Sequence, residues 1–198
     1  MIGYVVGGAA IILWLFVLRI FRKTNLRFWR YIVGSAGVFI IGLVVFMPLL
    51  TEPLARIVAL MASVPGKVTS FYSAYYKYSS IMIASSDGAI SLTIDFECSG
   101  IIEILAFVAL LAFFSVYSVW ERIWVGISGV LYIILANAFR IVVIAMIIHF
   151  GGIDKYYIAH TYVGRIVFYG LSVVLYFYTF TRPQITHQRV GTFKYDAD

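Results

Sequence analysis

Three side chains that could do chemistry lie at the ends of apolar runs. Cys98, the only cysteine, lies where the polar segment Asp95–Gly100 meets an apolar stretch. Arg140 interrupts a second apolar run, and His160 precedes a third. A thiol, a guanidinium and an imidazole can supply a nucleophile, a stabilising charge and an acid/base. A lone cysteine cannot form an intramolecular disulfide, so the combination predicts thiol chemistry at a membrane surface.

The composition indicates an integral membrane protein. The chain is 63% hydrophobic and 12% charged, with a mean hydropathy of +0.97, which a soluble domain does not reach. Its net charge of +6 does not indicate a nucleic-acid partner, because many basic residues gather in short stretches beside apolar runs. The run 2–18 has no small-residue cleavage site after it and is interpreted as a retained span.

The apolar runs predict an all-α polytopic membrane protein. A span needs about 20 mostly apolar residues. Because 123–149 is too long for one straight span, we expect a tilt, a kink near Arg140, an interfacial extension or a sixth, re-entrant segment. We expect one membrane domain over 1–181 and a tail over 182–198. The five predicted helices are 2–20, 31–50, 100–119, 123–149 and 161–181.

Basic residues predict the orientation. The loop 19–30 carries five basic residues and no acid, which favours the cytoplasmic side. The segment 51–99 and the loop 150–160 then face outward, and the tail from Arg182 faces the cytoplasm. We therefore expect a multi-pass plasma membrane protein with Cys98 on the extracytoplasmic side.

The outward segment has two predicted elements. Residues 54–64 favour an amphipathic interfacial helix, which Pro65-Gly66 should end. The turn sequence Ser85–Gly88 lies between two short apolar runs and favours a β-hairpin. A lone hairpin is marginal in water, so this one should pack on the helix ends.

The topology brings the three reactive residues together. Arg140 follows Arg122 by eighteen residues, or about 27 Å of helix, which nearly crosses a hydrocarbon core of about 30 Å. Arg140 therefore reaches the boundary at which Cys98 and His160 also lie. We expect the Cys98 sulfur and the Arg140 guanidinium roughly 4–8 Å apart, so that one carbonyl can touch both.

Neighbouring residues could support such a site. Asn137 lies three residues before Arg140 and shares its helix face. Glu103 could pair with Arg140 or with Arg165. Gly100 would let a substrate backbone approach the thiol closely.

Several alternatives remain open on these grounds. His149 rivals His160 as the acid/base, and each of the three groups also has an ordinary structural interpretation. A non-catalytic membrane scaffold or transporter subunit is the alternative function. A thiol–disulfide enzyme would need a second cysteine, and the chain has only one. A rhomboid-like serine protease would need a Gly-x-Ser-x-Gly element in a span, and the sequence has none. No metal or cofactor is expected.

The constellation resembles the exosortase/archaeosortase family of membrane-embedded protein-sorting transpeptidases. The similarity covers about 95–170, the expected catalytic core, although the chain is shorter than many members and is most similar to the compact variants. The matching residues are Glu97-Cys98-Ser99-Gly100-Ile101, Asn137-Ala138-Phe139-Arg140, and His160 with Gly164 and Phe168.

The resemblance implies a cysteine peptidase or transpeptidase with Cys98, Arg140 and His160 as its catalytic residues, and it favours His160 over His149. The thiolate would attack a peptide carbonyl. Arg140 and the backbone near Ser99-Gly100 would stabilise the oxyanion, and His160 would move the protons.

The resemblance also implies a partner. Family members act on exported proteins that carry a C-terminal tripartite tail, which has a short motif, an apolar span and a basic end. Such a tail would lie in the lipid bilayer beside the last three predicted helices. Whether the acceptor is a lipid, cell-wall material or water stays open.

Overall fold

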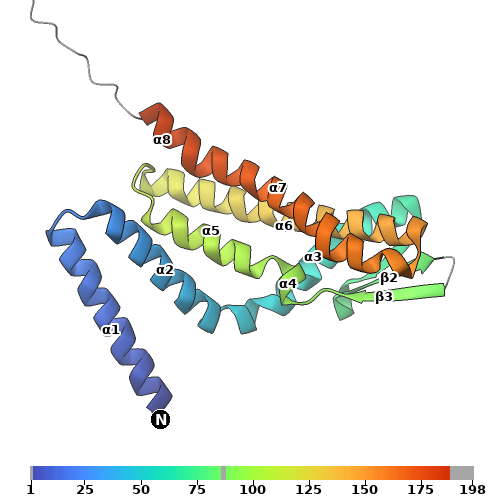
Figure 1. Cartoon of the computed structure of the whole chain (residues 1–198), viewed down its shortest axis with the longest axis horizontal. Helices are drawn as coiled ribbons and strands as arrows, with labels where there is room; N and C mark the ends of the chain where they lie inside the picture. Colours follow the sequence, from blue (N-terminus) through green and yellow to red (C-terminus); the bar gives the residue numbers. More distant parts are fainter. Residues whose placement is uncertain (1, 86–87, 188–198) are drawn as a thin grey trace, which may run out of the picture.

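The computed structural model describes residues 2–85 and 88–187 and shows an elongated bundle of helices with a small sheet at one end (Figure 1). We call this the sheet end, and we call the opposite end, with the α1–α2 and α5–α6 loops, the loop end. The elements are α1 (Ile2–Lys23), α2 (Arg27–Val45), α3 (Met47–Thr69), β1 (Tyr72–Tyr75), η1 (Tyr76–Tyr78), β2 (Ser80–Ser85), β3 (Gly88–Thr93), α4 (Phe96–Ser99), α5 (Ile101–Phe113), α6 (Val119–Gly151), η2 (Ile153–Lys155), η3 (Ile158–Val163), α7 (Gly164–Tyr176), η4 (Phe177–Thr181) and α8 (Arg182–His187).

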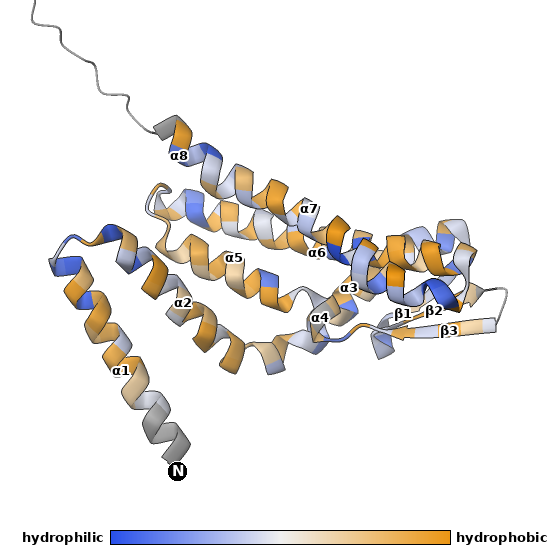
Figure 2. Cartoon of the chain, in the orientation of Figure 1, coloured by the Kyte–Doolittle hydropathy of each residue, from blue (hydrophilic) through white to orange (hydrophobic). Residues whose placement is uncertain are grey.

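The helices confirm an all-α polytopic membrane protein. Hydrophobic residues line most of α1, α2, α5 and α7, whereas hydrophilic ones gather in the α1–α2 loop (Figure 2). On α6 the exposed side chains of Leu131, Leu135 and Phe139 repeat every four residues and form one outward apolar stripe. Among the described residues, four helical stretches are long and apolar enough to cross a membrane, namely Arg27–Val45, Met47–Thr69, Val119–Gly151 and Ile153–Ile185.

α6 is one continuous helix of 33 residues. It begins at a capping box, in which the Ser118 hydroxyl accepts from the Glu121 N–H and the Glu121 carboxylate accepts from the Ser118 N–H. Its length of about 50 Å exceeds a hydrocarbon core of about 30 Å. The helix therefore continues past Arg140 and forms neither a break nor a re-entrant segment there.

The predicted helix 31–50 is two helices in the structure. α2 ends at Val45, and α3 begins at Met47 with Pro48 in its first turn. Proline lacks the N–H that would continue the first helix, and its fixed φ suits the start of the next.

The segment 51–99 differs from the prediction in the length of its helix and in the number of its strands. α3 is longer than 54–64 and runs through Pro65 and Gly66 to Thr69, and the next residue, Ser70, has a left-handed φ of 58°. The prediction that Pro65-Gly66 ends the helix was therefore wrong. The β2–β3 hairpin is present, with turn residues 86–87 outside the described residues, and β1 adds a third strand in the order β1-β2-β3.

A buried tyrosine ties the sheet to α3. The Tyr72 hydroxyl on β1 donates to the Ala62 carbonyl oxygen at 2.6 Å. Burial raises the pKa of Tyr72, which keeps the phenol protonated and able to donate.

Two apolar clusters meet along α6. The first joins α3, the sheet and the half of α6 beyond Ala138, and includes Val58, Ile81, Ile83, Ile144 and Ile148. The second joins α5, the earlier half of α6 and α7, and includes Phe107, Leu111, Ile133 and Phe168. The middle of α6, between Ile133 and Ile141, therefore lies at the junction of the two clusters.

Close α5–α6 packing gives a first prediction. A Cβ at Gly129 would overlap the buried ring of Phe107, whereas a Cβ at Gly170 on α7 would meet open space. Gly129→Ala should cost about 1–3 kcal/mol through overpacking, and Gly170→Ala should be neutral or slightly stabilising. Thermal unfolding of both variants in detergent, followed by circular dichroism, checks this. Equal melting temperatures would contradict the packing.

Candidate active site

Cys98 is held on a single helical turn between the sheet and α5. The Asp95 carboxylate caps this turn by accepting from the Cys98 N–H at 3.1 Å. Gly100 then joins this turn to α5 with a φ of +78°, a conformation that favours glycine. A Cβ at Gly100 would lie 3.3 Å from Asn137 Nδ2, so the glycine also lets the turn pack against α6.

Two residues of α6 contact Cys98. Asn137 Nδ2 donates to the Cys98 carbonyl oxygen, and Arg140 Nη2 lies 3.8 Å from the Cys98 sulfur. That separation is slightly shorter than the expected range. Asn137 and Arg140 are three residues apart and therefore share one helix face. Both are buried, with exposed fractions of 1% and 4%.

His160 also contacts the thiol. Its Nε2 lies 3.2 Å from the Cys98 sulfur, and its ring stacks on Tyr156 with 5.6 Å between centroids. His160 lies in η3, a π-helix. π-Helical turns occur frequently at functional sites, because their altered repeat redirects side chains. The sulfur therefore lies between an imidazole and a guanidinium.

The Arg140 guanidinium has further electrostatic partners. It lies over the Phe168 ring, with 5.9 Å from Cζ to the centroid, which is a favourable cation–π arrangement. Glu103, half-buried in the first turn of α5, has only a minor charge interaction with Arg140, and these two described residues form no ion pair. Arg165, the other expected partner of Glu103, has an exposed side chain on α7. The aromatic contact suits a cation buried inside a membrane protein.

His149 lies against the sheet. Its Nδ1 is within hydrogen-bond distance of the Ala84 carbonyl oxygen, and its ring stacks on Phe71 at 4.6 Å between centroids. The structure therefore brings His160 to Cys98 and leaves His149 with β2 and the residue before β1.

Ser99 and the polar neighbours of Cys98 are engaged locally. Ser99 is fully buried, and its hydroxyl donates to the Phe96 carbonyl oxygen at 3.0 Å. The sequence alone did not lead us to the capping role of Asp95. Aspartate is a preferred residue just before the first turn of a helix, so this signal was present in the sequence. The stacking of Tyr156 on His160 was also missed. In the part of the chain that the structure describes, no group of three or more His, Cys, Asp or Glu side chains could hold a metal ion.

Comparison with known proteins gives one match. The family model described as transmembrane exosortase matches residues 2–178, which run from α1 into η4 and include Cys98, Arg140 and His160. No curated protein and no solved structure matches the chain. The family model covers well over half of the sequence, and the fold is that of a multi-pass membrane protein. The chain therefore belongs to the transmembrane exosortase family.

Proposed function

We propose that this protein is a cysteine transpeptidase that cleaves the C-terminal sorting tail of exported proteins at the outer membrane boundary. One observation carries the proposal: the Cys98 sulfur lies 3.2 Å from His160 Nε2 and 3.8 Å from Arg140 Nη2. A nucleophile in reach of a base, with a fixed cation beside it, is the arrangement that thiol acyl transfer needs. Membership of the exosortase family supports a membrane transpeptidase-type role.

The first step is activation of the thiol. His160 Nε2 takes the proton of Cys98, and the resulting thiolate is stabilised by Arg140 and by the imidazolium. The thiolate then forms a bond to the carbonyl carbon of the substrate, and the negative charge moves from sulfur to the carbonyl oxygen. Arg140 lies close to the sulfur. Its planar set of donors can therefore stabilise the negative charge first on the thiolate sulfur and then on the carbonyl oxygen.

The second step releases the tail. The imidazolium of His160 gives its proton to the leaving amine as the carbon–nitrogen bond breaks, which leaves a thioester on Cys98. His160 then takes a proton from the acceptor, whose nucleophilic atom attacks the thioester and restores the thiol. The acceptor is a lipid, a cell-wall component or water.

The position of the site along α6 supports cleavage at a membrane boundary. From Val119 to Arg140 the helix rises about 32 Å, close to the thickness of a hydrocarbon core of about 30 Å. A tail whose apolar span lies beside α5, α6 and α7 would then present the peptide bond just before that span to Cys98.

Thiol reactivity tests the activation step without a substrate. His160→Gln should slow alkylation of Cys98 by iodoacetamide about tenfold near pH 7, because the thiol loses the base that makes it a thiolate. Cys98 is the only cysteine, so intact-mass spectrometry reads the reaction directly. His149→Gln is the matched control and should leave the rate within about twofold. Unchanged rates in both variants would favour the scaffold interpretation.

Tail cleavage tests the catalytic assignment. In cells that express this chain as their only exosortase, Cys98→Ala should leave tail-bearing exported proteins uncleaved. Arg140→Lys should slow cleavage about 100-fold or more, because lysine keeps the charge but loses the planar fork of donors. Mass spectrometry of membrane fractions detects the retained C-terminal tails. Normal cleavage by folded Cys98→Ala protein would refute the mechanism.

Topology is tested with single cysteines in a Cys98→Ser background. Thr93→Cys, at an exposed position of β3, should react with a membrane-impermeant maleimide on intact cells. Thr24→Cys, exposed in the α1–α2 loop, should react only after the cells are opened, because basic loops stay in the cytoplasm. The reverse labelling pattern would place the site on the cytoplasmic side.

A further inference from the structure

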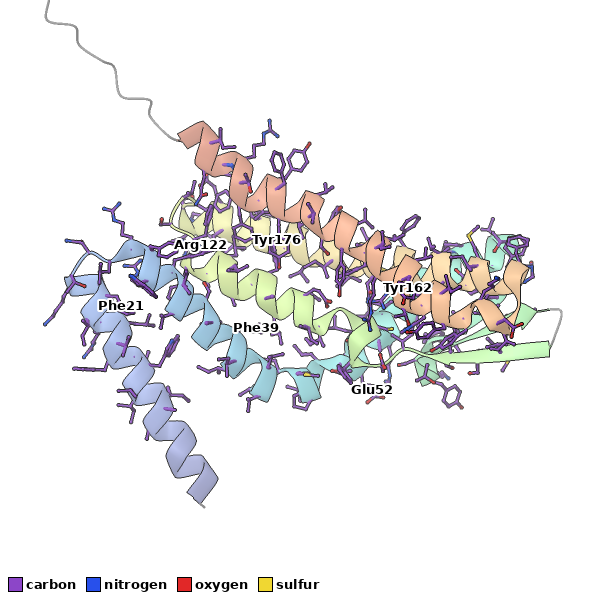
Figure 3. All side chains as sticks on the ribbon, in the orientation of Figure 1. Phe21, Phe39, Glu52, Arg122, Tyr162 and Tyr176 are labelled. Carbon is purple, nitrogen blue, oxygen red and sulfur yellow. The ribbon has the colours of Figure 1, made fainter. Side chains whose placement is uncertain are left out.

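A large pocket opens at the loop end, far from Cys98. It has a volume of about 950 Å³ and lies between α1, α2, the end of α5 and the start of α6. α1 is the outermost helix and is joined to the bundle through α2 (Figure 1). Figure 3 shows Phe21 and Arg122 at this end, whereas Glu52 and Tyr162 lie toward the sheet end. The pocket is therefore separate from the candidate active site.

The pocket lining is strongly basic. Four arginines contribute to it: Arg19 and Arg22 from α1, Arg30 from α2 and Arg122 from α6. No acidic residue is among the lining residues. Four cations from three helices around one pocket, with no acid beside them, favour an anionic ligand there.

Arg122 is held in place by the end of α5. Its Nη1 donates to the Ala112 carbonyl oxygen at 3.1 Å, and its Nη2 donates to the Phe114 carbonyl oxygen at 2.8 Å. These bonds satisfy carbonyls that a helix end leaves without partners. The Arg122 side chain therefore stays at the edge of the pocket, between the end of α5 and the start of α6.

Apart from Ser115, the rest of the pocket lining is apolar. It includes Ile12, Leu15 and Phe16 of α1 and Phe113 of α5. A free anion such as phosphate would use only the arginines, whereas an amphiphile would also cover this apolar wall. Basic pockets between membrane helices bind anionic lipid head groups, and cytoplasmic leaflets are rich in anionic lipids.

We propose that this pocket binds one anionic phospholipid, with its phosphate among the four arginines and an acyl chain along α1. The proposal does not depend on the proposed function. Such a lipid would bridge α1 to α5 and α6. In the structure α1 is attached to α2 through the Trp14 Nε1 bond to the Val33 carbonyl oxygen at 2.9 Å and through packing of Trp14 on Gly37. The lipid should therefore also stabilise α1.

Native mass spectrometry of the detergent-purified full chain tests the site. Titration with phosphatidylglycerol should fill one tight site, which phosphatidylcholine should occupy at least about tenfold more weakly, because the arginines recognise net negative charge. The double variant Arg22→Ala/Arg30→Ala should weaken phosphatidylglycerol binding about tenfold or more. Equal binding of the two lipids to the wild type would overturn the proposal.

Matched controls separate the pocket from general basicity. Lys23→Ala/Arg27→Ala removes the same charge from the same two helices but no pocket residue, and should leave binding within about twofold. Leu15→Trp should weaken binding by filling the apolar wall while it keeps all four arginines. Inorganic phosphate at millimolar concentration should not displace the lipid. Equal loss in both double variants, no effect of Leu15→Trp, or displacement by phosphate would each overturn the lipid assignment.

The same variants have a stability readout. Phosphatidylglycerol should raise the thermal unfolding temperature of the wild type and of Lys23→Ala/Arg27→Ala, because a ligand that binds only the folded state stabilises it. It should not raise that of Arg22→Ala/Arg30→Ala, provided that this variant retains the wild-type circular dichroism spectrum. If the double variant unfolds, the same measurement is made on Leu15→Trp. A rise in its unfolding temperature with phosphatidylglycerol as large as that of the wild type would count against the proposal.

Discussion

The hydrogen bond from the Asn137 amide to the Cys98 carbonyl oxygen is the constraint on which the candidate site depends. The Asn137 side chain is 1% exposed, and a buried amide needs a hydrogen-bond partner. The Cys98 carbonyl oxygen belongs to a one-turn helix, which offers few hydrogen-bond donors within itself. Their bond joins the turn that carries the thiol to α6, a helix of 33 residues. Because Arg140 lies one turn further on the same face, one contact sets the distance between sulfur and guanidinium. His160 then approaches the sulfur from a different helix.

The polar centre is stable because two apolar clusters enclose it. Asn137 and Arg140 face inward at the junction of the clusters, while Leu131, Leu135 and Phe139 face the lipid on the opposite side of α6. A charged group inside a membrane protein is tolerated when it faces the protein interior and has partners. The Phe168 ring and the Cys98 sulfur are such partners of Arg140. Cys98, Asn137 and Arg140 therefore lie together on the inward-facing side of α6, where the two apolar clusters meet.

Hydropathy and helix rise were sufficient to predict the features that the membrane itself imposes. The predicted helices 31–50, 123–149 and 161–181 overlap candidate spans, and the approach of Arg140 to Cys98 follows from eighteen residues of helix. The predicted helix 100–119 is instead the shorter α5, and the candidate span Met47–Thr69 was expected as an interfacial helix over 54–64. The missed features depend on non-local packing. β1 is a Tyr-rich segment that becomes a strand only by pairing with β2, and α3 continues through Pro65 because it packs on the sheet and α6. Local propensity indicated an end there, and tertiary contacts outweighed it.

The π-helical turn at His160 has a consequence for how this protein can change in length. Such a turn accommodates about one residue more than an α-helix of the same rise. Downstream, Gly164 packs on Ile144 and Phe168 lies under Arg140, so α7 cannot rotate freely. Loss of one residue between His160 and Gly164 would turn the imidazole by about 100° around the helix axis, away from the sulfur. Many substitutions in this stretch would leave the ring in place, whereas a single deletion would remove it. The spacing of η3 is therefore as strongly constrained as its histidine.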